Sequence, residues 1–218
     1  MPVEDENAIG KKVLSGGNSR GRPIDVDKRN AVLQAATNLF FEHGYAATSI
    51  EQVAEKAGVS KVTIYNHFGG KRGLFSESVN AQCLVIREHF TLEELPKGTL
   101  RARLNVIAEA VNAFLSRPEM VQFERRIAAE TEYEPEIDEA YLNAGPRRMK
   151  AALARLLEAL ETAGELKVQD PSLAAEQFVS MCEGMGDLER RFGQLNDSSQ
   201  NRKRIEGTID VFLKAYRP

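Results

Sequence analysis

The polar residues best suited to chemistry are basic and lie within residues 48–74. No Asp or Glu occurs between Glu55 and Glu77, an interval that contains Lys56, Lys61, Lys71 and Arg72. Such a surface suits the phosphates of DNA. Two of these lysines begin predicted helices, where a phosphate would relieve the repulsion between the lysine charge and the helix dipole. The alternative is that exposed lysines there cost only about a few tenths of a kcal/mol and occur by chance.

Two short helices joined by a glycine turn are predicted within the same segment. The first begins at Thr48, which forms a capping box with Glu51 three residues later. Gly58 ends it, because glycine adopts the left-handed conformation without steric cost. Ser60 then caps a second helix that runs to about Asn66. The arrangement predicts a helix-turn-helix.

The second of these helices has an apolar side and an outward side. Ile64 and Phe68 are the apolar residues available to hold it down. Lys61, Val62, Thr63, Tyr65, Asn66 and His67 are left mostly outward. The last two lie at the end of a short helix, where contact with the DNA backbone is as reasonable as contact with base edges.

A preceding helix completes a three-helix unit over residues 24–75. It is expected from Asp25 or Asp27 to His43, where apolar residues recur at helical spacing. Residues 1–23 are polar without a helical period and predict a mobile arm. The arm ends in Arg20-Gly21-Arg22-Pro23, which resembles an AT-hook core whose arginines, Arg20 and Arg22, would lie in a minor groove. The alternative is a merely basic tail.

The distribution of charge favours DNA binding more than its sum does. The chain has 218 residues and a net charge of −3. Residues 11–80 hold ten Lys and Arg against six Asp and Glu, whereas residues 1–10 and 81–218 are net acidic. The basic part therefore coincides with the helix-turn-helix. No apolar run approaches the roughly 20 residues of a membrane span, and the N-terminus lacks an apolar signal core, so a cytoplasmic protein without a membrane partner is expected.

The remaining sequence, residues 76–218, predicts a helical second domain. Apolar residues recur at helical spacing, and Pro and Gly mark the ends of helices over about 71–90, 100–116, 120–131, 136–144, 149–160 and 171–192. Ser198 or Ser199 is expected to cap a last helix. No segment alternates as a strand would, so the fold class is all-α. The helix from Lys71 begins on the DNA side and links the two halves.

Several side chains of this second part could line a pocket for a small apolar or amphipathic ligand. They are Phe114, Phe123, Arg126, Phe178, Met181, Cys182 and Met185. The alternatives are an ordinary core for the apolar residues and a solvated face for the arginine. Gly184 and Gly186 within one helix indicate a kink or a close approach of another helix. Cys83 and Cys182 are expected to be buried thiols, with a redox role as the alternative.

An enzyme is disfavoured. His43, His67 and His89 lack the spacing of a zinc-binding helix, and no nucleophile elbow, phosphate-binding loop or dinucleotide-binding glycine pattern occurs. No cofactor or metal is expected.

The residues from Lys28 to Phe75 resemble the DNA-binding domain of the TetR/AcrR family of bacterial transcriptional regulators. The matching marks are Leu39-Phe40, Gly44-Tyr45, Thr48, Ala57-Gly58-Val59-Ser60, Ile64-Tyr65-Asn66-His67-Phe68, Lys71 and Leu74. The resemblance implies phosphate contacts by Thr48, Tyr65 and Lys71, and insertion of the outward residues of the helix from Ser60 into the major groove. Gly69-Gly70 departs from the family pattern, which puts the cap of the next helix in doubt.

The second part resembles the AefR-like subgroup of that family. This resemblance implies a homodimer paired through the last two long helices and an internal ligand pocket. The function expected is a ligand-responsive regulator of double-stranded operator DNA, most simply a repressor released from a palindromic operator. The alternative is an architectural or activating DNA-binding protein without a small-molecule inducer.

Overall fold

The computed structural model describes residues 26–88, 90, 97–194 and 197–218, and within these ranges it contains helices and turns but no strand. The prediction of an all-α fold is confirmed. The helices are α1 (Val26–His43), α2 (Ile50–Ala57), α3 (Lys61–Phe68), α4 (Lys71–Glu88), α5 (Leu100–Leu115), α6 (Pro118–Glu130), α7 (Glu136–Ala144), α8 (Pro146–Thr162), α9 (Pro171–Arg191) and α10 (Ser198–Tyr216). The predicted arm, with Arg20 and Arg22, lies outside the described residues.

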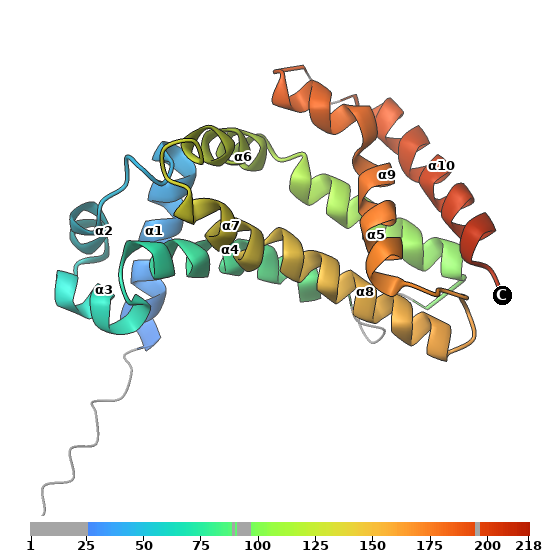
Figure 1. The fold of residues 1–218 in the computed structure, drawn as a ribbon, viewed down its shortest axis with the longest axis horizontal. Helices are drawn as coiled ribbons and strands as arrows, with labels where there is room; N and C mark the ends of the chain where they lie inside the picture. Colours follow the sequence, from blue (N-terminus) through green and yellow to red (C-terminus); the bar gives the residue numbers. More distant parts are fainter. Residues whose placement is uncertain (1–25, 89, 91–96, 195–196) are drawn as a thin grey trace, which may run out of the picture.

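The helices form an elongated arrangement with two different ends (Figure 1). The helices α2 and α3 lie at one end, and α9 and α10 lie at the other. Between them run α4 and the nearly continuous pair α7 and α8, while α6 lies beside the C-terminal end of α1. Any influence of one end on the other must therefore pass through α4, α6 or α7.

The start of α2 differs by one residue from the sequence prediction. Ser49, not Thr48, is the N-cap, and Gln52 replaces Glu51 as the reciprocal partner in the capping box. The Thr48 side chain is only 1% exposed, and its hydroxyl donates to the Gly44 carbonyl at 2.8 Å. The interior cannot leave a buried hydroxyl unpaired, so Thr48 bonds the preceding turn and the next residue takes the cap.

The turn between α2 and α3 forms as predicted. Gly58 ends α2 with φ +65°, and the Ser60 hydroxyl accepts from the Thr63 amide to cap α3. Ile64 and Phe68 are buried in the hydrophobic core, and α3 packs against α2 and α4. The helix α3 runs two residues past the predicted end, because Phe68 belongs to its buried side and Gly69 closes it with φ +73°.

The C-terminal helices follow the predicted order, with one corrected cap and one confirmed kink. Asp197 caps α10 instead of Ser198 or Ser199, because its carboxylate accepts from two backbone amides of the first turn. Gly184 interrupts α9 with φ +47° and ψ −146°. A Cβ on Gly184 would lie 3.0 Å from the Arg204 side chain of α10, so glycine permits both the kink and the close approach. No helix within the described ranges is long and apolar enough to cross a membrane.

Candidate DNA-binding surface and ligand cavity

The helix α3 brings the predicted base-reading residues together on one exposed surface. Val62 is 65% exposed and Tyr65 is 55% exposed, and Lys61 and Asn66 are also exposed. Thr63 and His67 are half-buried at the edges of this surface. The Thr63 hydroxyl lies 2.9 Å from that of Ser60, so a hydrogen bond joins the capping residue to the first turn of the helix. An exposed valine and tyrosine beside polar groups suit the thymine methyl groups and the phosphates of a major groove.

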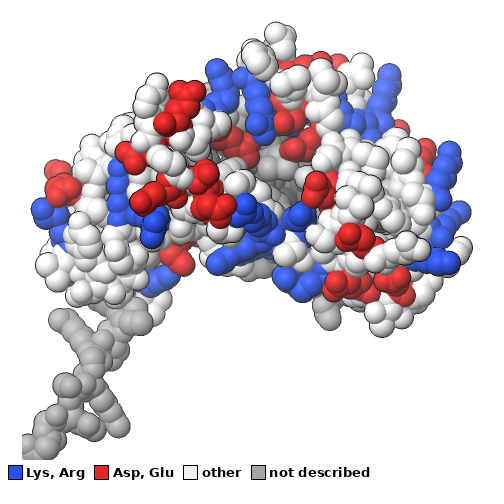
Figure 2. Space-filling model, in the orientation of Figure 1, with Lys and Arg blue, Asp and Glu red and all other residues white. Residues whose placement is uncertain are grey.

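Two of the basic side chains beside α3 are held by carboxylates. Lys61 pairs with Glu51 of α2 at 2.9 Å, and Arg72 pairs with Glu136 of α7 at 2.9 Å. The hydrogen bond from Lys61 lowers the pKa of the Glu51 carboxyl, and the same bond raises the pKa of Lys61. Figure 2 shows acidic and basic side chains interspersed around the α2 and α3 end of the molecule. Phosphates would have to replace these carboxylates as partners.

Lys71 contacts a backbone carbonyl and an aromatic ring, unlike Lys61 and Arg72. Its Nζ donates to the Ala46 carbonyl at 3.3 Å and lies 4.3 Å from the centroid of the Tyr45 ring. Burial lowers the pKa of Lys71, while Glu134 and Glu130 act in the opposite direction. The Thr48 hydroxyl bonds to the same segment at Gly44. Thr48 and Lys71, which were both predicted to contact phosphates, thus bond the turn formed by residues 44–48. We call this segment the α1–α2 turn.

The α1–α2 turn is also bonded to α6, a contact that sequence reasoning missed. The Glu130 carboxylate, at the end of α6, accepts from the amides of Tyr45 at 2.9 Å and Ala46 at 3.1 Å. Gly44 makes room for it, because a Cβ there would lie 2.2 Å from Glu130 Oε1. The residues are separated by about 85 positions in the chain, so no local pattern could have indicated their contact.

A second set of contacts joins α6 to the C-terminal end of α1. Arg126 donates from Nη1 to the Phe41 carbonyl at 2.6 Å. The Phe41 ring stacks on Phe123 with 4.1 Å between centroids and 5° between planes. The helix α6 is therefore fixed to α1 by a polar contact and by an aromatic one.

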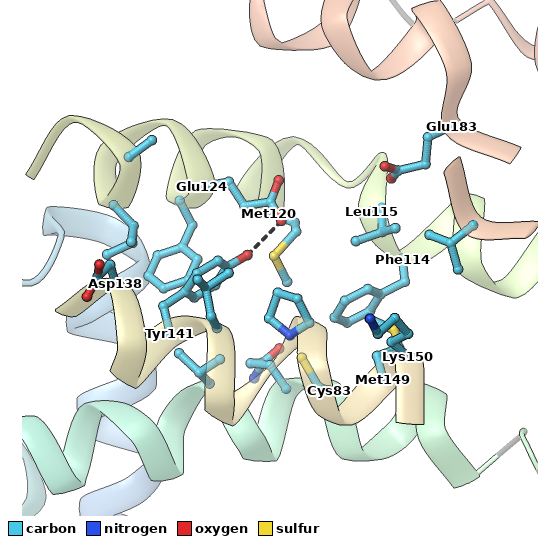
Figure 3. A pocket seen from close by; sticks show the side chains of 18 of the residues that line it. Cys83, Phe114, Leu115, Met120, Glu124, Asp138, Tyr141, Met149, Lys150 and Glu183 are labelled. Carbon is cyan, nitrogen blue, oxygen red and sulfur yellow. Dashed lines mark hydrogen bonds between the residues drawn. The ribbon is translucent and has the colours of Figure 1, made fainter. Parts of the chain in front are cut away.

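A cavity of about 530 Å³ lies among α1 and α4–α9. Its walls are mainly apolar, and Figure 3 shows Phe114, Met120 and Met149 around its centre. The residues that line it are Phe41, Val79, Gln82, Cys83, Phe114, Leu115, Met120, Phe123, Glu124, Ile127, Ala128, Thr131, Asp138, Tyr141, Leu142, Pro146, Met149, Lys150, Glu176, Val179, Ser180, Glu183 and Arg191. Its volume falls in the range of about 300–1,000 Å³ that small-molecule sites occupy.

Polar groups in the cavity have perturbed proton affinities. Tyr141 donates from its hydroxyl to Glu124 at 2.7 Å. Burial, followed by the Glu124 charge, raises the pKa of Tyr141 far above its usual range, and burial also raises the pKa of Glu124. Burial raises the pKa of Glu183 to about 7. Buried titratable groups in an apolar cavity are typical of functional sites.

The seven predicted pocket residues separate into two groups. Phe114 and Phe123 line the cavity, whereas Arg126, Phe178, Met181, Cys182 and Met185 do not. Arg126 faces α1, as described above. The other four form one side of α9 that turns away from the cavity: Phe178 packs edge-on against Phe212 of α10 at 5.0 Å, and Met185, beyond the kink, is 62% exposed. The opposite side of α9, with Val179, Ser180 and Glu183, faces the cavity.

Both cysteines are buried, and neither forms a disulfide. Burial raises the pKa of Cys83 to about 11 and that of Cys182 to about 12. Cys83 lines the cavity and Cys182 does not. Both therefore stay protonated as thiols at neutral pH.

The helix-turn-helix with its exposed α3, joined to an all-helical part that encloses a cavity, defines a DNA-binding regulator. Residues 32–77 match the profile of the bacterial regulatory proteins of the tetR family, and residues 102–218 match that of the AefR-like transcriptional repressor C-terminal domain. The chain belongs to the TetR family, whose members are transcriptional regulators and not enzymes.

Solved structures agree with this assignment over most of the chain. A TetR-family regulator from Mesorhizobium loti MAFF303099 is 28% identical, with a TM-score of 0.75 over 90% of this chain and 100% of the other. The flavonoid-responsive regulator FrrA is 32% identical, with a TM-score of 0.69 over 88% of this chain and 97% of the other.

Two curated relatives match shorter stretches of the chain. The transcriptional activator FasR of Mycolicibacterium smegmatis is 40% identical over 30% of this chain, and the transcriptional repressor ComR of Escherichia coli is 47% identical over 26%. These matches span 31% and 27% of the relatives' own length. They therefore support DNA binding and do not distinguish activation from repression.

Proposed function

We propose that this protein is a homodimeric repressor that leaves a palindromic operator when a small molecule occupies the cavity. In this proposal residues 24–75 bind DNA, and residues 76–218 bind the ligand and form the dimer. The two copies of α3 would enter adjacent major grooves about 34–36 Å apart. Residues 1–23 would contribute Arg20 and Arg22 to the neighbouring minor groove.

The DNA contacts divide into two kinds. Lys61, Val62 and Thr63, on the first turn of α3, would read base edges. Tyr65 and Lys71 would bond phosphates. The exposure of Tyr65 and the position of Lys71 beside the α1–α2 turn support these roles. Since Thr48 has a buried and occupied hydroxyl, we assign it the role of fixing Gly44 and not that of a direct phosphate contact.

The observation that carries the proposal is that α6 touches both the cavity and the α1–α2 turn. Met120, Phe123, Glu124 and Ile127 of α6 line the cavity. Glu130, one turn after the last of these, bonds the amides of the turn that holds Lys71. A ligand that displaces α6 would therefore displace a phosphate contact directly. Such a ligand acts only to the extent that it prefers the displaced arrangement.

An exposed apolar surface on α9 and α10 supports the dimer. Leu173, Met185 and Leu188 of α9 are 49%, 62% and 47% exposed, Phe192 directly after α9 is 78% exposed, and Val211 of α10 is 55% exposed. Large apolar side chains gathered on two adjacent helices are typical of an interface between subunits. The family assignment supports the same arrangement.

The relative FrrA is named for its response to flavonoids. By that similarity we extend the proposal to an aromatic ligand, which would pack against Phe114 and Phe123.

The decisive experiment isolates an operator by selection from random DNA and measures binding by fluorescence anisotropy, with random DNA as control. Specific binding about 10³-fold tighter than random binding is expected, and a ligand found by thermal shift should weaken it. Equal affinity for both DNAs would refute specific regulation, and a reporter fused to the operator separates repression from activation.

A further inference from the structure

Glu183 is an acidic group in the cavity wall without a visible partner. It is half-buried and lines the cavity from α9. Figure 3 shows its carboxyl pointing from α9 toward Leu115. Among the described residues, no hydrogen bond or ion pair engages its side chain. A carboxylate removed from water without a compensating donor is unfavourable, so its presence at an apolar cavity requires an explanation.

The position of Glu183 is fixed by the kink in α9. Gly184 follows it directly and leaves the helical conformation, with φ +47° and ψ −146°. The Arg204 side chain of α10 fills the space beside the kink, within 3.0 Å of where a Cβ of Gly184 would lie. The backbone next to Glu183 is thus set by the kink and by the neighbouring helix α10.

Of the two arginines near Glu183, only Arg191 lines the cavity, and other carboxylates engage it. Arg191 donates from Nε to Asp187 at 2.9 Å and lies 3.4 Å from Glu124. Arg190 lies 3.8 Å from Asp187, its guanidinium nitrogens are buried without a hydrogen bond to any described residue, and it does not line the cavity. Neither arginine forms an ion pair with Glu183. The Glu183 carboxyl is therefore open to a donor within the cavity.

The proton affinity of Glu183 agrees with a missing partner. Burial is the main cause that raises its pKa, Asp187 and Glu124 raise it further, and Arg190 and Arg191 only partly oppose them. A donor or cation placed beside the carboxylate would reverse this effect. The remaining charged groups of the cavity do not supply one, because Lys150 pairs with Glu176 at 3.1 Å.

We propose that the cavity takes an amphipathic ligand whose polar end carries N–H or O–H donors, either an ammonium or a hydroxyl group, and that Glu183 accepts them. Glu124 lines the same cavity and offers a second carboxylate near that end, while Phe114, Met120 and Met149 contact the apolar body. Ligands that end in a carboxylate or phosphate are disfavoured while Glu183 is ionised, because like charges brought together out of water repel each other. This assignment rests on the proposed function of the cavity.

The test uses three naphthalene compounds that share a carbon skeleton and differ in the end group: 1-naphthylmethylamine, 1-naphthalenemethanol and 1-naphthoate. Isothermal titration calorimetry with the full chain should give affinities for the amine and the alcohol at least about tenfold higher than for the carboxylate. Tighter binding of the amine would indicate a natural ligand with a charged end, and tighter binding of the alcohol would indicate one with an uncharged end. Binding of the carboxylate as tight as that of the others would overturn the assignment.

The variant Glu183→Gln tests the residue itself. The amide keeps an acceptor for the alcohol but removes the charge, so the preference for the amine over the carboxylate should fall about tenfold. Glu189→Gln is the matched control, because Glu189 is an exposed residue of α9 that does not line the cavity. An equal change for all three compounds, or the same change in the control, would contradict a role in recognition.

A separate readout keeps this assignment distinct from the function of the cavity. The same compounds are added to the complex with selected operator DNA. If the amine binds as expected and leaves the DNA affinity unchanged, ligand-driven release is wrong and the recognition by Glu183 stands. If 1-naphthoate alone releases DNA, the recognition is wrong and the release stands.

Discussion

Glu130 of α6 accepts hydrogen bonds from the backbone amide of Tyr45 at 2.9 Å and from that of Ala46 at 3.1 Å. The carbonyl of Ala46 accepts in turn from Lys71. One peptide segment thus lies between a helix of the cavity wall and a predicted phosphate contact.

Replacement of Glu130 by alanine should uncouple the cavity from DNA. The turn would lose its bonds to α6, so movement of α6 would no longer shift Lys71. Ligand should then weaken operator binding at least about fivefold less than in the native protein, since coupling energies of this kind are about 1–3 kcal/mol. Anisotropy titrations with and without ligand measure the effect. Glu132→Ala, at an exposed residue just beyond α6, is the control, and an unchanged ligand response in Glu130→Ala would contradict the coupling route.

Replacement of Lys71 by alanine should weaken binding to operator and random DNA alike. A lysine that bonds a phosphate contributes counterion release but no sequence information. The slope of log affinity against log salt should therefore fall by about 1. Titrations at several salt concentrations give the slope. Lys97→Ala alters an exposed lysine that precedes α5, outside the helix-turn-helix, and should leave the slope unchanged. A loss confined to operator DNA would argue that Lys71 reads sequence.

Replacement of Val62 by alanine should change which bases are preferred. The side chain is 65% exposed on the first turn of α3, so its truncation should hardly affect the free energy of unfolding. Loss of an apolar contact with a base would relax the preference at one position of each half-site, by about 1–3 kcal/mol. Selection from random DNA with both proteins gives the comparison. A uniform loss over all sequences would show that α3 docks differently.

The two cysteines should resist alkylation in the folded protein and should make its stability depend on alkaline pH. Burial raises their pKa values from 9.0 to about 11 for Cys83 and about 12 for Cys182. Above pH 9 the unfolded chain loses thiol protons that the folded chain keeps, so stability should fall as the pH rises from 9 toward 11. Urea unfolding at successive pH values measures it.

A cavity ligand should further distinguish the two thiols. Cys83 lines the cavity and Cys182 does not. A bound ligand that stabilises the fold slows alkylation of both thiols, and it should slow that of Cys83 further by covering it. Mass spectrometry after iodoacetamide treatment resolves the two sites. Rapid modification of Cys83 at pH 8 in the native protein would mean that the site is open and its thiol acidic.

Local chemistry determined much of the DNA-binding unit in advance. Gly58, Ser60 and the apolar spacing of Ile64 and Phe68 act within a few residues of one another, so the turn and the exposed side of α3 were predicted correctly from sequence. The capping residue was wrong by one position. Thr48 and Ser49 are both suitable caps, and only the burial of Thr48 beside Gly44 decided between them.

Tertiary packing decided the cavity and its link to DNA. Phe178, Cys182 and Met185 were expected to line the pocket, but a helical period does not state which neighbouring helix a residue meets. In the structure Phe178 packs on α10, and the cavity is lined instead by the side of α9 that carries Glu183. Nothing in the sequence indicated the contacts that Glu124 and Glu130 make, because Glu124 bonds Tyr141 of another helix and Glu130 bonds a turn about 85 residues away. Sequence determined the helices and their local ends, whereas contacts between distant segments were fixed only when the helices packed together.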